Sequence, residues 1–163
     1  MSLKSYQAKR NFDRTSEPSV SRTKAREDAL VYVFQKHRAS RLHYDLRLED
    51  NGVLKSWAVP KMPVGKAGVK RLAVQTEDHP LGYEDFEGTI PEPGYGAGTV
   101  EIWDSGTYRP VEKTATKWVV EISGRRLRGL FALIRIKARE GGAKTWLFFK
   151  AKETPPQSPD KKK

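Results

Sequence analysis

A two-residue turn between two strand-like segments is the feature that most limits how this chain can fold. Residues 42–48 read Leu-His-Tyr-Asp-Leu-Arg-Leu, so apolar and polar side chains alternate as they do in a half-buried β-strand. Asn51-Gly52 follows, and this dipeptide favours the positive φ angles of a tight hairpin turn. Residues 53–59 supply the returning strand. The segment therefore predicts an antiparallel hairpin.

The rest of the middle of the chain has the same character. Residues 31–34 are β-branched and aromatic, and Gly and Pro separate the later apolar runs. Further strands are predicted at residues 70–77, 98–104, 117–123, 128–137 and 144–151. Helix is limited to a turn or two around residues 24–30. Many short strands with tight turns predict an all-β antiparallel barrel or sandwich, and the four tryptophans are expected to pack in its core.

The composition is that of one globular domain between two polar ends. With 37% hydrophobic residues, a chain of 163 residues can bury a core. We expect a basic N-terminal arm over residues 1–28, the domain over residues 29–152 and a disordered basic tail over residues 153–163. The lack of cysteine excludes disulfides and thiolate metal sites. No apolar run suits a membrane span or a signal peptide, so a cytoplasmic location is expected.

The net charge of +11 favours a polyanionic partner, because neutralised phosphates release their condensed counterions. Nucleic acid is the partner that we expect, although ribosomal, chromatin and membrane-surface proteins can be equally basic. Charge therefore indicates a class of partner and leaves the chemistry to be read from individual residues.

Two of the three histidines lie beside a row of polar side chains. Side chains at i, i+2 and i+4 of a strand share one face, so His43, Asp45 and Arg47 point the same way. A turn at residues 38–41 would bring His37 beside His43. Two imidazoles and a carboxylate suit Mn, Fe or Zn, and the hard carboxylate oxygen favours Mn where phosphate also binds. The planar guanidinium of Arg47 suits two phosphate oxygens.

Each of these residues also has a structural interpretation, because a lone histidine is often structural and a polar strand face often contacts only water. His79 and Tyr83 flank Pro80, which is expected to end a strand, and either a functional loop or an ordinary turn explains them. The basic stretch from Lys61 to Arg71 is either a solvated loop or a contact to a nucleic acid backbone. Arg71 occupies a strand position that could face the site.

Residues 35–48 resemble the signature of the 3′-phosphoesterase domain of bacterial DNA ligase D, which also occurs in a free-standing form in archaea and bacteria. The resemblance extends over about residues 3–150. It continues through residues 52–61, 70–74, 77–80, 86–88, 90–91, 95–100, 103–104 and 106–108. So long a series of matched motifs is more specific than the set of metal ligands alone.

The resemblance implies a compact β-barrel with a polar active-site concavity, and Mn-dependent repair of DNA 3′ ends in non-homologous end joining. That family removes a 3′-terminal ribonucleoside by phosphodiester cleavage and then hydrolyses the 3′-phosphate to a 3′-hydroxyl that can be ligated. Any ligase or polymerase partner is expected to act in trans. The metal ligands of the family match His37, His43 and Asp45, its phosphate contacts match Arg47 and His79, a site tyrosine matches Tyr83, and supporting positions match Gln35, Lys61, Arg71 and Glu77.

Two alternatives from other classes fit parts of the sequence. A non-catalytic nucleic-acid-binding barrel needs only a basic groove and no metal. A non-haem iron oxygenase would use His43, Asp45 and the distant His79 as a facial triad. The first leaves the clustered histidines unexplained, and the second leaves His37, Arg47 and the basic charge unexplained.

Overall fold

The computed structural model describes residues 29–91, 97–137 and 144–152. These residues form nine strands and a short 3₁₀ helix, η1, which confirms the prediction of an all-β fold. In chain order the elements are β1 (Leu30–Arg38), β2 (Leu42–Asp50), β3 (Val53–Val59), β4 (Lys70–Pro80), η1 (Tyr83–Asp85), β5 (Gly88–Ile90), β6 (Gly98–Lys113), β7 (Lys117–Gly124), β8 (Arg128–Arg135) and β9 (Thr145–Lys150). Within the described ranges, no helix is long and apolar enough to cross a membrane.

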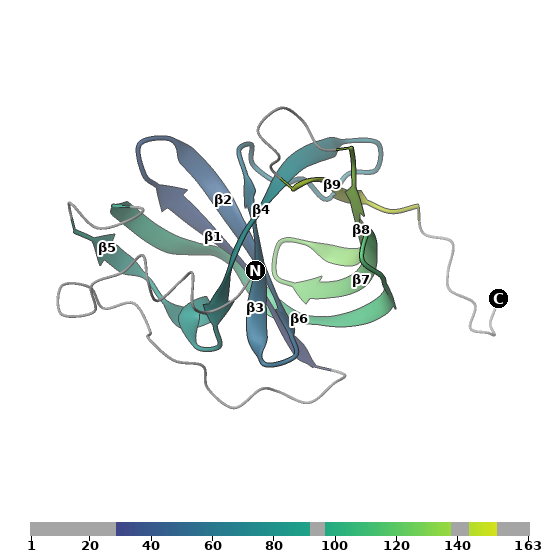
Figure 1. The fold of residues 1–163 in the computed structure, drawn as a ribbon, viewed down its shortest axis with the longest axis horizontal. Coiled ribbons are helices and arrows are strands. Elements are labelled where there is room, and N and C mark those ends of the chain that lie inside the picture. Colours follow the sequence, from purple (N-terminus) through teal and green to yellow (C-terminus); the bar gives the residue numbers. More distant parts are fainter. Residues whose placement is uncertain (1–28, 92–96, 138–143, 153–163) are drawn as a thin grey trace.

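Eight of the strands close into an antiparallel barrel. Hydrogen-bonded neighbours follow the order β1-β2-β3-β4-β9-β8-β7-β6, and pairing between β1 and β6 closes the ring. β5 pairs with β6 outside that ring (Figure 1). The predicted hairpin joins β2 to β3, with φ angles of 50° at Asn51 and 85° at Gly52. Because the turn has two residues, Asp50 lies opposite Val53, and this pairing sets the register of both strands.

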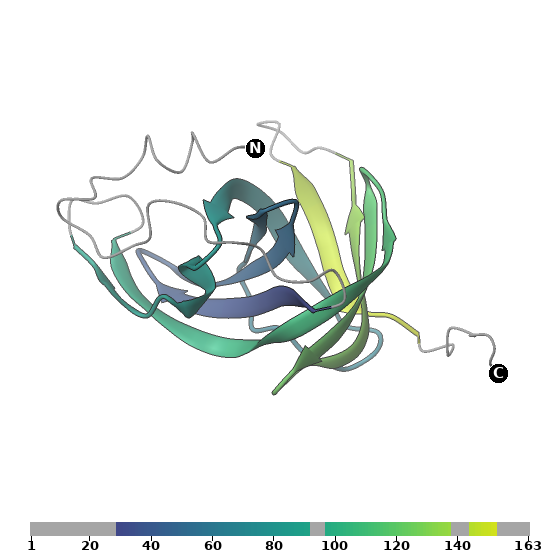
Figure 2. The ribbon, with the colours of Figure 1, turned by 90° about the horizontal axis from the view of Figure 1, so that it is seen from below.

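β6 is a long strand that links the two sides of the molecule (Figure 2). One edge pairs with β1, whereas the other edge pairs first with β5 and then with β7. The sequence predicted a strand over residues 98–104 only, and the residues that follow include Gly106 and Pro110, which are types that usually interrupt strands. That prediction is wrong. Pro110 lies beyond the segment paired with β1, so β6 has only one bonded edge there and tolerates the missing N–H.

The main core fills the barrel with aromatic and aliphatic side chains. Trp57, Trp118 and Trp146 are buried there, as predicted, and the ring of Trp57 makes edge-to-face contacts with the other two. Trp103 is only partly buried, and its ring packs against Phe34 at a centroid distance of 5.8 Å. The alternating apolar residues of β2 point into this core, so its polar residues are left on the opposite face.

A second apolar cluster covers part of that opposite face. It comes largely from β4 to β6 and consists of Leu54, Leu81, Tyr83, Phe86, Ile90 and Val100, with Val31 packed against it. The segment from the end of β4 through η1 to β5 therefore folds back over β1 and β6. The polar face of β1 and β2 is thus partly enclosed rather than open to water.

A buried carboxylate holds the β7–β8 turn against this framework. Asp104 accepts hydrogen bonds from the Tyr32 hydroxyl at 2.7 Å and from the backbone N–H groups of Arg125, Arg126 and Leu127 at 2.8–3.0 Å. Burial, followed by the charge and hydrogen bond of Asp104, raises the pKa of Tyr32 well above its usual value. The phenol therefore remains a donor, and β1 stays fixed to β6.

Several predicted boundaries need correction. The strand predicted over residues 70–77 runs to Pro80, and the one predicted over residues 128–137 ends at Arg135. The predicted four-residue turn has three residues, because Arg38 still pairs with Leu42. The short helix predicted near residues 24–30 falls mostly outside the described residues, and Leu30 itself begins β1. The predicted arm and tail also lie outside the described residues.

Candidate metal centre

The pairing of β1 with β2 places the candidate ligands beside one another. His37 lies directly opposite His43, and Gln35 lies opposite Asp45. The side chains of alternate residues share a face, so the imidazoles and the carboxylate lie on the face turned away from the barrel core. The convergence follows from a three-residue turn that keeps the strands in register.

The ligand atoms of these three side chains form a tight group. His37 Nδ1 lies 3.2 Å from His43 Nε2, and the Asp45 carboxylate oxygens lie 3.4 Å from the first nitrogen and 3.3 Å from the second. Ligand atoms held about 2.1 Å from one ion in tetrahedral or octahedral geometry lie roughly 3.0–3.4 Å apart. The donor set therefore fits a divalent transition metal. Among the described residues, these three are the group of histidine and carboxylate side chains that lie close enough together to hold one metal ion.

The electrostatics of the group favour an ionised carboxylate. Burial alone would raise the pKa of Asp45, but hydrogen bonds from His37 and His43 and the charge of Arg47 hold that pKa well below its usual range. Burial also lowers the pKa of His43, and the hydrogen bond and charge of Asp45 outweigh that effect, so the pKa of His43 is raised. Without a metal, the carboxylate and the imidazoles thus satisfy one another.

Arg47 is a buried cation held by neighbours on both sides. Its Nε donates to Gln35 Oε1 at 2.7 Å, and its Nη1 donates to Ser56 Oγ at 2.8 Å. Its Nη2 lies 3.6 Å from an Asp45 oxygen, and its guanidinium lies 4.8 Å from the centre of the Tyr83 ring. The side chain is 5% exposed, so the guanidinium has little freedom to turn away from the ligand group.

Gln35 connects Arg47 to the segment around η1 that folds back over β1. While its Oε1 accepts from Arg47, its Nε2 donates to the backbone carbonyls of Tyr83 at 2.7 Å and Phe86 at 3.2 Å. All the strong polar groups of this buried amide are therefore in use. Gln35 fits the supporting position that the family resemblance implied, and its position orients Arg47.

His79 lies at the end of β4, which ends at Pro80 as predicted. Its Nδ1 is 3.2 Å from Arg47 Nη1 and 3.1 Å from the backbone oxygen of Glu77. The guanidinium can only donate and the carbonyl can only accept, so the tautomer of His79 decides which contact is a hydrogen bond. Its ring also meets the Tyr83 ring edge-on at 4.7 Å. The oxygenase alternative placed His79 among the metal ligands, yet it contacts Arg47 instead.

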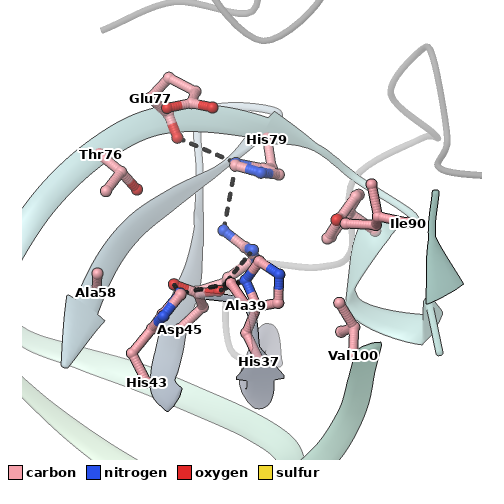
Figure 3. A pocket seen from close by; sticks show the side chains of 12 residues that line it. His37, Ala39, His43, Asp45, Ala58, Thr76, Glu77, His79, Ile90 and Val100 are labelled. Carbon is pink, nitrogen blue, oxygen red and sulfur yellow. Dashed lines mark hydrogen bonds and ion pairs between the residues drawn. The ribbon is translucent and has the colours of Figure 1, made fainter. Parts of the chain in front are cut away.

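A cavity of about 310 Å³ joins these groups. Figure 3 shows His37, His43 and Asp45 together on one side and Glu77 with His79 at another, while Ile90 and Val100 form an apolar wall. Thr76 and Glu77 both line the cavity, although the side chains of adjacent residues in a regular strand point to opposite faces. A register shift between β3 and β4 interrupts the alternation at this point. The remaining lining residues are Ala39, Arg47, Ala58 and Tyr83.

Three predicted site residues do not line this cavity: Gln35, which lies behind Arg47, and Lys61 and Arg71. Lys61 is exposed, and Arg71 donates from Nε to the backbone oxygen of Met62 at 2.9 Å. The sequence analysis did not predict Ser56 as a site residue, although its position opposite Arg47 could have been predicted. The two-residue turn at Asn51-Gly52 places Ser56 opposite Arg47 by counting.

Comparisons with known proteins identify the family of the chain. Residues 35–135, more than half of the chain, match the family described as the DNA Ligase D 3′-phosphoesterase domain. The multifunctional non-homologous end joining protein LigD of Pseudomonas aeruginosa is 47% identical over 167 residues, which cover 98% of this chain and 20% of that protein.

Two mycobacterial relatives are similar. The multifunctional non-homologous end joining DNA repair protein LigD of Mycobacterium tuberculosis is 46% identical over 138 residues, covering 82% of this chain and 18% of that protein. The LigD protein of Mycolicibacterium smegmatis is 40% identical over 162 residues, covering 93% and 21%. The chain thus spans about a fifth of the length of these relatives. With most of its length matched at this level of identity, the chain belongs to the DNA ligase D 3′-phosphoesterase domain family.

Proposed function

We propose that this chain is a divalent-metal-dependent phosphoesterase that heals DNA 3′ ends for non-homologous end joining. It would remove a 3′-terminal ribonucleoside as a phosphodiesterase and a 3′-phosphate as a phosphomonoesterase, leaving a 3′-hydroxyl for a ligase or polymerase acting in trans. The names of the relatives support the repair context. The observation that carries the chemistry is the group His37, His43 and Asp45 beside the buried guanidinium of Arg47.

Each side chain has a role that its position suggests. His37, His43 and Asp45 would hold the cation, and Mn²⁺ suits two imidazole nitrogens with one hard carboxylate oxygen. A bound cation supplies positive charge that offsets the charge developing on a phosphate oxygen. Arg47 Nη2, which makes only the 3.6 Å ion pair within the described residues, would bind another phosphate oxygen.

The remaining walls suit the rest of a 3′-terminal nucleotide. His79 lies beside Arg47 and would contact the same phosphate. Ile90 and Val100 offer an apolar surface against which a sugar can pack. The net charge of +11 would attract the strand to the site over a longer range.

The test is a product map with defined primers. The protein is incubated with Mn²⁺ and with primers that end in a 3′-phosphate or a 3′-ribonucleotide, and the ends are resolved by gel and mass spectrometry. We expect 3′-hydroxyl products that disappear when a chelator is added. A protein that only binds nucleic acid would retain the primers unchanged with or without chelator, and that result would overturn the proposal.

His43→Ala tests the assignment of the metal ligand. Loss of one imidazole from the group should abolish turnover while the barrel stays folded, because His43 is partly exposed and lies outside the core. Leu42→Ala is the matched control: it is the preceding residue on β2, it is 42% exposed, and it does not line the cavity. Normal turnover by a folded His43→Ala protein would contradict the assignment.

A further inference from the structure

A second cavity opens on the opposite face of β3 and β4. Its volume is about 460 Å³. Trp57 and Gln75 line this cavity, whereas the residues that follow them, Ala58 and Thr76, line the cavity of the candidate metal centre. Successive side chains of a strand point to opposite faces, so the sheet itself separates the two cavities.

The walls of the second cavity carry excess positive charge. Its four cationic lining residues are Lys55, Lys113, Arg135 and Lys144. Lys55 pairs with Asp78 at 3.3 Å and Lys113 with Asp50 at 2.9 Å. Arg135 and Lys144 are exposed and form no ion pair within the described part of the chain. Two positive charges are therefore available at the cavity for an anionic group.

The tryptophans that line the cavity come from three strands and are its most deeply buried lining residues, so we call them its floor. The rings of Trp118 and Trp146 meet that of Trp57 at centroid distances of 5.4 and 5.8 Å. Trp146 Nε1 donates to Gln75 Oε1 at 3.1 Å, whereas the buried Nε1 of Trp57 has no acceptor among the described residues. Buried N–H groups nearly always have a partner, so an acceptor is expected close to this floor.

We propose that this cavity binds a phosphate-bearing group, supplied by a free nucleotide or by a nucleotide of a nucleic acid strand. The fork of Arg135 and the ammonium of Lys144 would hold the phosphate oxygens above the tryptophan floor. The volume lies within the usual range of about 300–1,000 Å³ for small-molecule sites. None of the lining residues belongs to the candidate metal centre, so the inference stands independently of the proposed function.

The indole N–H signals of the full-length protein report on this cavity directly. ¹⁵N-labelled protein in chelator is titrated at constant ionic strength with inorganic phosphate, a nucleoside monophosphate and a short oligodeoxynucleotide. We expect saturable shifts of the Trp57, Trp118 and Trp146 signals, with little change for Trp103, which does not line the cavity. Saturation by the monophosphate points to a free nucleotide, and saturation by the oligonucleotide alone points to a strand. No saturable shift with any of the three would overturn the inference.

Charge-matched variants separate a site from general attraction. Arg135→Ala/Lys144→Ala should weaken binding by roughly tenfold, which corresponds to about 1.4 kcal/mol. Both residues are exposed, so the fold should persist. Arg128→Ala/Lys152→Ala removes the same charge from exposed positions outside the cavity and should leave the affinity close to wild type. An equal loss in the two double variants would show long-range attraction only and refute the site.

Discussion

At the scale of single residues, Arg47 shows how a buried cation is kept in one orientation. Its charge is partly balanced by Asp45, but its direction is set by neutral acceptors, Gln35 Oε1 and Ser56 Oγ. A guanidinium uses a rigid planar fork to make these contacts together, and an ammonium cannot reproduce that geometry. Arg47 is therefore expected to be sensitive even to a change that preserves its charge.

Arg47→Lys should lower the single-turnover rate of 3′-phosphate hydrolysis by about 10²–10³, the usual effect of removing one oriented donor from an active site. The Mn²⁺ affinity measured by calorimetry should change little, because neither side chain ligates a metal. Arg109→Lys is the control, since Arg109 pairs with Glu121 on the surface. Unchanged hydrolysis by Arg47→Lys would exclude Arg47 from the reaction.

Asp45 makes the metal-free protein sensitive to pH. Its pKa in the folded state is lowered, so its ionised form stabilises the fold above the unfolded pKa, and this contribution is lost as the pH falls. The same contact raises the pKa of His43 in the folded state. The protonated form of His43 therefore also stabilises the fold. This contribution is complete below the unfolded pKa of His43 and is lost as the pH rises through the raised pKa. The pair therefore stabilises the protein most in mildly acidic solution.

The free energy of unfolding of Asp45→Asn in chelator should fall furthest below that of wild type near pH 5. Below about pH 3.9 the gap should narrow by roughly 1.4 kcal/mol for each pH unit, and it should also narrow above neutrality. Urea unfolding at a series of pH values measures this gap. Glu121→Gln removes an exposed carboxylate and should give a small difference at every pH. A constant gap for Asp45→Asn would contradict the assigned pKa shifts.

At the scale of elements, the closure of β1 on β6 holds the candidate ligand group in place. His37 pairs with His43 on one side and with Val100 of β6 on the other. Two residues earlier, Gly98 begins β6 with a φ of 143°, and a Cβ added there would meet the backbone carbonyl of Arg38. The two strands can therefore approach this closely only because the residue is glycine.

Gly98→Ala should lower both the stability and the Mn²⁺ affinity, because the end of β1 that carries His37 must move away from β6. Gly52→Ala is the contrast. Gly52 also has a positive φ, of 85°, but an added Cβ would meet nothing within 4 Å. It should cost about 1–2 kcal/mol from backbone strain and leave Mn²⁺ binding unchanged. Equal metal affinities for the two variants would show that β1–β6 closure does not position His37.

The elements also show where prediction from sequence stopped. The alternation of residues 42–48 was sufficient to place three polar side chains of β2 on one face. In a strand, the direction of each side chain depends only on its position along that strand. The place of His79 depended on a register shift between β3 and β4, where Leu54 lies opposite His79 and Ser56 opposite Thr76. Such a shift arises from the packing of neighbouring strands and leaves no periodic signal. The strand position of Arg71 could have faced the site, but Arg71 contacts the backbone of Met62 instead.

At the scale of the whole molecule, metal binding and folding should be coupled. The ligand group requires β1 and β2 in register, so the unfolded chain lacks it and a metal should bind the folded state preferentially. At a free Mn²⁺ concentration a hundred times the dissociation constant, the gain is about 2.7 kcal/mol. For a chain of this size, the melting temperature should rise by about 5–10 °C.

Thermal unfolding with Mn²⁺ and with chelator measures that rise. His43→Ala should show almost none of it, whereas Leu42→Ala should show all of it, since Leu42 lies outside the cavity. A similar rise in His43→Ala would mean that the ion binds elsewhere on the protein.

The sequence by itself determined the local features: the all-β character, the hairpin at Asn51-Gly52, and the shared face of His43, Asp45 and Arg47. These depend on turn preferences and side-chain alternation within about ten residues. Only the tertiary structure decided that the Tyr83 ring lies against the guanidinium of Arg47, and that four cationic side chains line a second cavity. Those arrangements require barrel closure and irregular registers between strands far apart in the chain, and their energy comes from packing rather than from any local preference.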